Sequence, residues 1–259
     1  MNIRVEVKDA IATVTITREA VKNAFNAELI HELTQTFLKL EAQSEVRIIV
    51  LTGGGKVFSA GADLNYMKQL GTFSFEENKK DAESLAILFR TISDSSKATL
   101  ARVNGHAFGG GLGLIATCDA SVAVKSAKFS FSEVKLGMIP ATIGPFVYQK
   151  IGYSHAKHLF TRGKVFSTDE ALRVGLIHEV SEDEKELDKK INEMISDFLN
   201  ASPQAIREAK RLVDYLEAGH SDVFERTTEW IAELRSSDEA QEGIQAFLEK
   251  RSPSWKQSE

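Results

Sequence analysis

The first half of the chain alternates between short strand-like runs and longer helical runs. Apolar residues recur at every second position in residues 4–7 and 12–17, and further strand-like runs cover 46–53, 98–105, 120–125 and 128–132. Apolar residues at helical spacing mark 26–43, where Asn26 is the expected N-cap, and a second helix is expected over 77–92. Because strands that alternate with helices form parallel sheets covered by helices, we predict an α/β core over residues 1–143.

The strand signal fades from Gly144 onward, and amphipathic helices follow one another. They are predicted over residues 186–200, 202–219, 221–235 and 237–251. Three of them begin with a Ser or Asp cap, and Pro203 stands in the first turn of the second. Amphipathic helices without a large core of their own pack on other surfaces. We therefore expect residues 144–259 to form a mostly helical region for oligomerisation and pocket completion.

Composition and charge exclude several classes of protein. No apolar run approaches the roughly 18 residues that cross a bilayer, and the N-terminal residues follow a strand pattern unlike a signal peptide, so a cytoplasmic protein is expected. The formal net charge of -5 provides no basic footprint for nucleic acid. The single Cys118 excludes an internal disulfide and a multi-cysteine metal site.

The glycine triplet Gly109, Gly110 and Gly111 follows the strand-like run 98–105 and precedes an apolar helical segment. The first N–H groups of a helix have no intrahelical partner, so they can bind an anion or a developing oxyanion. Glycine also lets a ligand approach the backbone without meeting a Cβ. The alternative explanation is a tight turn between a strand and a closely packed helix.

A second loop of small residues, 59–62, follows the strand-like run 46–53 and also precedes a helical start. Two such loops at the ends of neighbouring strands can direct two N–H donors at one carbonyl oxygen. The pair of loops therefore predicts an oxyanion hole.

Four segments, in this order and at these spacings, resemble the crotonase superfamily of enoyl-CoA hydratases and isomerases over essentially the whole chain. They are FSAGADL (58–64), VNGHAFGGGLGL (103–114), FSFSEVKLGMIPA (129–141) and AFLEKR (246–251). The resemblance implies a spiral of ββα units with a C-terminal helical trimerisation region, commonly in a hexamer of two trimers. It also implies an acyl-CoA thioester substrate, with coenzyme A as part of the substrate and no separate cofactor or metal.

The resemblance assigns roles to individual residues. The backbone N–H groups of Ala62 and Gly110 would donate to the thioester oxygen. The residues expected to contact coenzyme A are Lys22, Ala60, Ala62, Asp63, Leu64, Asn65, Phe247 and Lys250, the last two from a neighbouring subunit. For Lys22 and Lys250, a solvated surface charge is the alternative interpretation.

The expected catalytic acids differ from those of the best-known family members. Family hydratases usually carry a glutamate two residues after the glycine triplet, where this chain has Gly113. The second expected carboxylate is Glu133, which lies between apolar residues including Phe131 and Val134, so burial should raise its pKa toward the range useful for proton transfer. The missing side chain at Gly113 predicts either a pocket widened for a branched acyl group or room for a water.

These residues predict hydration of a 2-enoyl-CoA, with Glu133 taking a proton from water as it adds at C3 and delivering a proton to C2. One glutamate also suits an isomerase, and a non-catalytic protein that binds CoA esters is a third reading. The residues 141–145 (ATIGP), which follow Pro140, together with GGGLGL (109–114), look similar to bacterial methylglutaconyl-CoA and isohexenylglutaconyl-CoA hydratases. That similarity implies a branched, carboxylated enoyl thioester from leucine or terpene breakdown.

Overall fold

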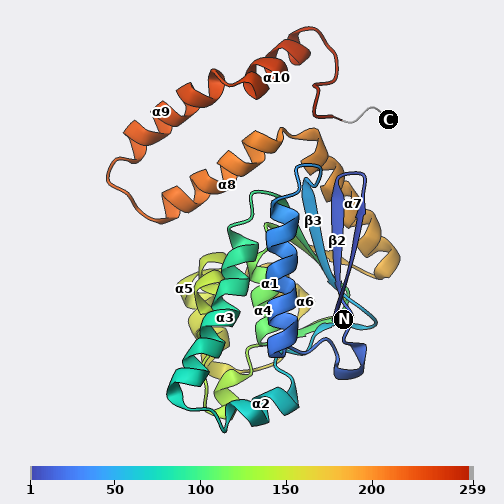
Figure 1. Cartoon of the computed structure of the whole chain (residues 1–259), viewed down its shortest axis with the longest axis vertical. Coiled ribbons are helices and arrows are strands. Elements are labelled where there is room, and N and C mark those ends of the chain that lie inside the picture. Colours follow the sequence, from blue (N-terminus) through green and yellow to red (C-terminus); the bar gives the residue numbers. More distant parts are fainter. Residues whose placement is uncertain (1, 257–259) are drawn as a thin grey trace. The chain divides into compact units, whose positions relative to one another are not determined.

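A computed structural model describes residues 2–256, which divide into two compact units (Figure 1). The first unit comprises the residues up to 95 together with 99–192, and the second comprises 96–98 together with the residues from 193 onward. Within the described range, no helix has the length and apolar character needed to span a membrane.

Two sheets form the centre of the first unit. The larger sheet has the order β1 (Ile3–Lys8), β2 (Ile11–Ile16), β3 (Ile48–Gly53), β5 (Ala98–Val103), β7 (Ala120–Val124), β10 (Glu179–Ser181). The smaller has the order β4 (Val57–Ser59), β6 (His106–Phe108), β8 (Lys128–Ser130), β9 (Phe166–Ser167). The strands β3, β5 and β7 are each followed directly by a strand of the smaller sheet and then by helical structure. This repetition is the predicted series of ββα units, and it confirms the α/β fold class.

Helices cover these sheets. Those that begin in the first unit are η1 (Glu19–Val21), α1 (Ala27–Glu41), α2 (Leu64–Leu70), α3 (Phe75–Ser93), α4 (Gly110–Thr117), η2 (Glu133–Leu136), α5 (Gly144–Arg162), α6 (Thr168–Arg173) and α7 (Glu184–Asn200). The Asn26 side chain accepts a hydrogen bond from the Leu29 N–H at 2.9 Å, so this predicted N-cap is confirmed. The α1 residues Leu29, Leu33 and Phe37 are buried, and α1 packs beside α3 (Figure 1).

The second unit contains the end of α7 and the helices α8 (Pro203–Glu217), α9 (Val223–Arg235) and α10 (Asp238–Leu248). All four helices were predicted, and the caps Ser202 and Ser237 accept hydrogen bonds from the N–H groups of Ala205 and Ala240. The division between the units differs from the predicted boundary at residue 143. Helix α5 packs on α4, and β9 completes the smaller sheet, so residues 144–192 belong with the core.

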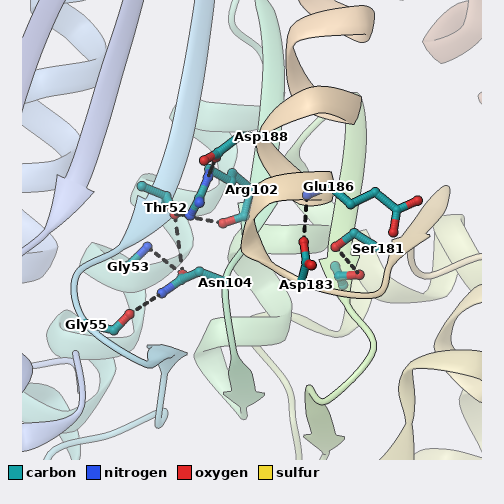
Figure 2. Close-up of polar contacts among 10 residues, drawn as sticks. Thr52, Gly53, Gly55, Arg102, Asn104, Ser181, Asp183, Glu186 and Asp188 are labelled. Atoms are coloured by element: carbon teal, nitrogen blue, oxygen red, sulfur yellow. Dashed lines mark hydrogen bonds and ion pairs between the residues drawn. The ribbon is translucent and has the colours of Figure 1, made fainter.

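The ends of β3 and β5 are tied together by a buried polar network (Figure 2). The Asn104 side chain donates to the Gly55 carbonyl at 2.8 Å and accepts from the Gly53 N–H at 3.1 Å. Thr52 Oγ1 donates to the Arg102 carbonyl at 2.8 Å, and the Arg102 guanidinium pairs with Asp188 at 2.7 Å. These bonds fix the ends of the two strands that lead into β4 and β6, and thereby into the two small-residue loops.

Candidate active site

The two small-residue loops contact each other backbone to backbone. Gly61 has φ +84°, and a Cβ on it would lie 2.9 Å from the Phe108 carbonyl oxygen. A Cβ on Gly111 would lie 2.9 Å from the Ser59 carbonyl oxygen, and one on Gly109 would lie 3.9 Å from the Gly61 Cα. Side chains at Gly61 and Gly111 would force the loops apart.

The N–H of Ala62 points away from the neighbouring chain segment. The Phe25 N–H donates to the Gly61 carbonyl at 2.7 Å, and the Asp63 N–H donates to the Phe25 carbonyl at 2.8 Å. This is a parallel bridge between Phe25 and Ala62, in which the N–H of the central residue faces the opposite side. Within residues 2–256, the Ala62 N–H has no hydrogen-bond acceptor.

Gly110 is the first residue of α4, so helix geometry leaves its N–H without an intrahelical acceptor. Gly109 caps the helix with φ +49° and ψ -119°, a conformation that favours glycine, and its own N–H donates to the Ser130 carbonyl at 3.1 Å. No acceptor for the Gly110 N–H occurs among the described residues. Gly61 and Gly109 approach each other, and each lies one residue before an unpaired N–H group. An oxyanion hole formed by the N–H groups of Ala62 and Gly110 stays a prediction.

The Glu133 carboxylate lies beside this loop contact. Glu133 begins η2, directly after β8, and its Oε1 is 3.3 Å from the position that a Cβ on Gly109 would occupy. Its Oε2 is buried without a hydrogen-bond partner in the described part of the chain. Burial raises the pKa of Glu133 above the ordinary glutamate value, although a hydrogen bond with its own backbone acts in the opposite direction. An unpartnered carboxylate oxygen beside two unpaired N–H groups can move a proton to or from a bound ligand.

The residues predicted to contact coenzyme A lie largely on an exposed rim of this site. Ala62, Leu64 and Asn65 are exposed, and the Ala60 N–H donates to the carbonyl of Lys22 at 3.0 Å. Lys22 has a left-handed backbone with φ +54° and an exposed side chain. Their contact with coenzyme A stays a prediction.

The polar groups of Asp63 are engaged within the protein, and its predicted contact with coenzyme A stays a prediction. Its carboxylate accepts from the N–H groups of Asn65 and Tyr66 at the start of α2 and pairs with Arg18 at 3.2 Å. Its carbonyl accepts from the Met67 N–H at 2.8 Å. These bonds orient the loop that carries Ala62.

The space beside Gly113 is filled, so the expectation of a wider pocket or a water at this position is wrong. A Cβ on Gly113 would lie 2.4 Å from Ile143 Cγ2 and 2.8 Å from two ring carbons of Phe89. Phe89 and Ile143 are both buried. Their apolar side chains occupy the volume that a glutamate at this position would need.

Phe247 and Lys250 lie in the second unit, at the end of α10 and just after it. Both are exposed, and the Lys250 N–H donates to the Phe247 carbonyl at 3.2 Å. Their predicted contact with coenzyme A, from a neighbouring subunit, stays a prediction.

The residues that support the two donor loops were not predicted from the sequence. The Phe25 ring lies 3.2 Å from the position of a Cβ on Gly110. The Asn23 side chain donates to the carbonyls of Gly54 and Val57 at 2.9 and 2.7 Å, and Arg18 pairs with Asp63. These residues lie in irregular backbone between β2 and α1, where no periodicity identifies a buried position.

Comparison with known proteins agrees with this geometry. Residues 6–258 match the family model described as enoyl-CoA hydratase/isomerase. The chain is 31% identical to the short-chain-enoyl-CoA hydratase of Clostridium acetobutylicum over 96% of this chain and 95% of that protein. It is also 31% identical to the crotonyl-CoA hydratase of Syntrophomonas wolfei over 96% of each chain.

A solved structure shows the same architecture. The crystal structure of an enoyl-CoA hydratase from Shewanella pealeana is 36% identical and aligns with a TM-score of 0.95 over 98% of this chain and 96% of that one. The resemblance to the crotonase superfamily is thus confirmed. The chain is an enzyme of the enoyl-CoA hydratase/isomerase family.

Proposed function

We propose that the protein adds water across the double bond of a 2-enoyl-CoA thioester. The observation that carries this proposal is the contact between two loops, one with the unpaired N–H of Ala62 and one with the unpaired N–H of Gly110, with the half-buried Glu133 carboxylate beside Gly109. Two N–H donors polarise a thioester carbonyl and stabilise the negative charge that develops on its oxygen.

The proposed reaction uses Glu133 twice. As the oxygen of water bonds to C3, its proton passes to the Glu133 carboxylate, and the electron pair of the double bond moves through C2 to the thioester oxygen. The enolate collapses, and C2 takes the proton from the Glu133 carboxylic acid. The carboxylate is regenerated, and the net change is the addition of one water molecule. Because Oε2 of Glu133 is buried and has no hydrogen-bond partner among the described residues, Glu133 accepts a proton more readily than an exposed glutamate does.

An isomerase is the second candidate function, and the packing around Gly113 is compatible with it. Apolar side chains fill the space where a second carboxylate would stand, so Glu133 is the carboxylate next to the glycine loop. A single carboxylate can take a proton from C4 and return it to C2 through the same enolate. The non-catalytic reading is tested by the same experiment.

For the substrate, we propose a branched, carboxylated enoyl thioester such as 3-methylglutaconyl-CoA or isohexenylglutaconyl-CoA. The support for this choice is the sequence similarity over residues 141–145 together with GGGLGL (109–114). Room for a branch has to come from a position other than Gly113, because Ile143 and Phe89 close that space. We also propose a cytoplasmic homo-oligomer, a trimer or a dimer of trimers, with no nucleic-acid or membrane partner.

The test is incubation with linear, branched and carboxylated enoyl-CoAs, followed by mass spectrometry. Hydration adds the mass of one water molecule, whereas isomerisation leaves the mass unchanged and shifts the double bond. The proposal predicts hydration, fastest with the branched carboxylated substrates. Binding of every CoA ester without turnover would contradict it, and preferred hydration of linear substrates would overturn the substrate class alone.

A further inference from the structure

Lys150 is a largely buried cation that the proposed reaction does not use. It lies in α5, and its Nζ is 2.5 Å from the Cys118 carbonyl oxygen and 3.5 Å from those of Ile115 and Ala116. Burial lowers the pKa of Lys150, and the nearby Cys118 and Asp119 partly oppose this shift. Burying an ammonium group is costly unless it is hydrogen-bonded and paired with negative charge.

Besides the nearby Asp119, Lys150 meets the partial negative charge at the C-terminal end of α4. The last carbonyls of a helix have no intrahelical donors, and the helix dipole concentrates partial negative charge there. Ile115, Ala116 and the C-cap Cys118 are the residues at this end. Gly110, one of the two proposed oxyanion donors, is the first residue at the opposite end of the same helix.

We infer that Lys150 is a positioning residue for the oxyanion hole, which neutralises the negative end of α4 so that the positive end at Gly110 stabilises the enolate oxygen more strongly. Helix α4 has 8 residues. A helix of that length is only about 12 Å long, so the charge at one end is felt at the other. This inference rests on the proposed role of Gly110 in the reaction.

The same helix contact also positions α4 mechanically. Ile143, directly before α5, packs against Gly113, and Lys150 binds the carbonyls one turn further along α4. An effect of Lys150 through charge must therefore be separated from an effect through packing. Arginine retains the charge and the donors, glutamine retains a donor without charge, and methionine retains only the bulk of the side chain.

The test directly measures how strongly the site stabilises an enolate. A 3-oxoacyl-CoA ionises to an enolate with its own ultraviolet absorbance, so titrating the bound ligand against pH gives its apparent pKa in the site. We expect Lys150→Met and Lys150→Gln to raise this pKa by up to about one unit, a loss of roughly fivefold to tenfold in enolate stabilisation, as expected for one charge at this distance and an effective dielectric constant of about 20. Affinity for a saturated acyl-CoA, whose thioester does not ionise to an enolate, should change less than about twofold.

Two controls complete the experiment. Lys150→Arg should give a pKa close to that of the unaltered protein, because the charge remains. Lys190→Met removes another partly buried lysine, one that pairs with Glu179 at 3.0 Å, and should leave the ligand pKa unchanged. If Lys150→Met does not fold, comparing the ligand pKa in Lys150→Gln with that in Lys150→Arg still measures the effect of removing the charge.

The outcomes separate this inference from the proposed function. If the unaltered protein binds the 3-oxoacyl-CoA without stabilising its enolate, the oxyanion hole itself is wrong. If the unaltered protein stabilises the enolate and the neutral Lys150 variants do so equally, only the role of Lys150 is wrong. Equal losses in the arginine and neutral variants would mean that Lys150 acts through packing, which also overturns the inference.

Discussion

At the scale of single residues, the proposed site depends on backbone N–H groups that have no hydrogen-bond acceptor among the residues that the structure describes. The Ala62 N–H faces away from the bridge to Phe25, and the Gly110 N–H belongs to the first turn of α4. The Glu133 carboxylate lies next to Gly109, with one oxygen buried and unpartnered. Each of these features is unfavourable for folding alone, which supports the proposal that they bind an anion and transfer a proton.

Gly110 can be tested with a pair of variants that differ in one donor. Gly110→Pro removes the N–H and adds a Cβ, whereas Gly110→Ala adds the Cβ alone, 3.2 Å from the Phe25 ring. Loss of one oxyanion-hole donor costs about 2.7–4 kcal/mol in the barrier, so turnover in Gly110→Pro should fall on the order of a hundredfold to a thousandfold below that of Gly110→Ala. Proline is tolerated in the first turn of a helix, and circular dichroism should show both variants folded. Equal turnover in the two variants would contradict the role of Gly110.

The raised pKa of Glu133 makes activity depend on pH. Glu133 must be ionised to take the proton of water, so kcat/KM should fall as the pH drops through its pKa, which lies above the ordinary value of 4.5. The measurement is a pH profile of kcat/KM with the preferred enoyl-CoA. An acidic limb at or below the ordinary value would show that the group seen in the kinetics is an exposed carboxylate.

The same shift affects stability with a defined sign. Because the pKa of Glu133 is higher in the folded than in the unfolded chain, its proton stabilises the folded state at low pH, and this stability is lost as the pH rises through the folded-state pKa. Glu133→Gln does not ionise, so the melting temperature of this variant should rise relative to that of the unaltered protein as the pH increases above the ordinary glutamate pKa of 4.5. Thermal unfolding at a series of pH values tests this; a difference that does not depend on pH would be evidence against burial of the ionised group.

At the scale of helices and strands, the sequence predicts the elements with strong periodicity. It does not predict features that depend on contacts with residues distant in the chain. The helix α1 with its cap Asn26 and the four C-terminal helices agree with their apolar spacing. The strands β4, β6, β9 and β10 were not predicted, because runs of two or three residues carry no recognisable period. The residues that fill the space at Gly113 come from α3 and from the residue before α5, so nothing near Gly113 in sequence reveals them.

The packing of α3 and α5 on α4 predicts the cost of a side chain at Gly113. Gly113→Ala places a Cβ within 2.4 Å of Ile143 and 2.8 Å of the Phe89 ring, and overpacking of this kind costs about 1–3 kcal/mol. The helix propensity of alanine offsets up to about 1 kcal/mol of this. Gly144→Ala is the matched control, because a Cβ there would be 4.0 Å from its nearest neighbour, Phe160. Denaturant unfolding should show that Gly113→Ala is the less stable variant; equal stability would mean that Ile143 and Phe89 move aside at little cost.

At the scale of the whole molecule, the second unit exposes large apolar side chains that a soluble monomer rarely leaves in water. Phe224 is 89% exposed, Phe247 82% and Leu248 73%. The helices α8, α9 and α10 also line an open apolar pocket of about 460 Å³, whose residues include Ile231, Leu234 and Ile244. These surfaces favour an assembly in which copies of the chain cover the apolar side chains.

We therefore expect a trimer or a multiple of three chains in solution at micromolar concentration. Multi-angle light scattering measures this directly, and a monomer would contradict the prediction. Phe224→Asp puts a charge into the exposed apolar surface and should weaken the assembly, whereas Val7→Asp, on the exposed edge strand β1 of the first unit, should leave the mass unchanged.

The central claim is that Glu133 carries the proton, and turnover of Glu133→Gln tests it most directly. Glutamine keeps the size of the side chain but cannot accept the proton of water, and general acid–base catalysis contributes about 10²–10⁴ in rate. We predict that kcat on the preferred enoyl-CoA falls by at least about a hundredfold, while affinity for a saturated acyl-CoA and enolate stabilisation of a bound 3-oxoacyl-CoA persist. Nearly full turnover on every accepted substrate would show that the proton carrier is another group.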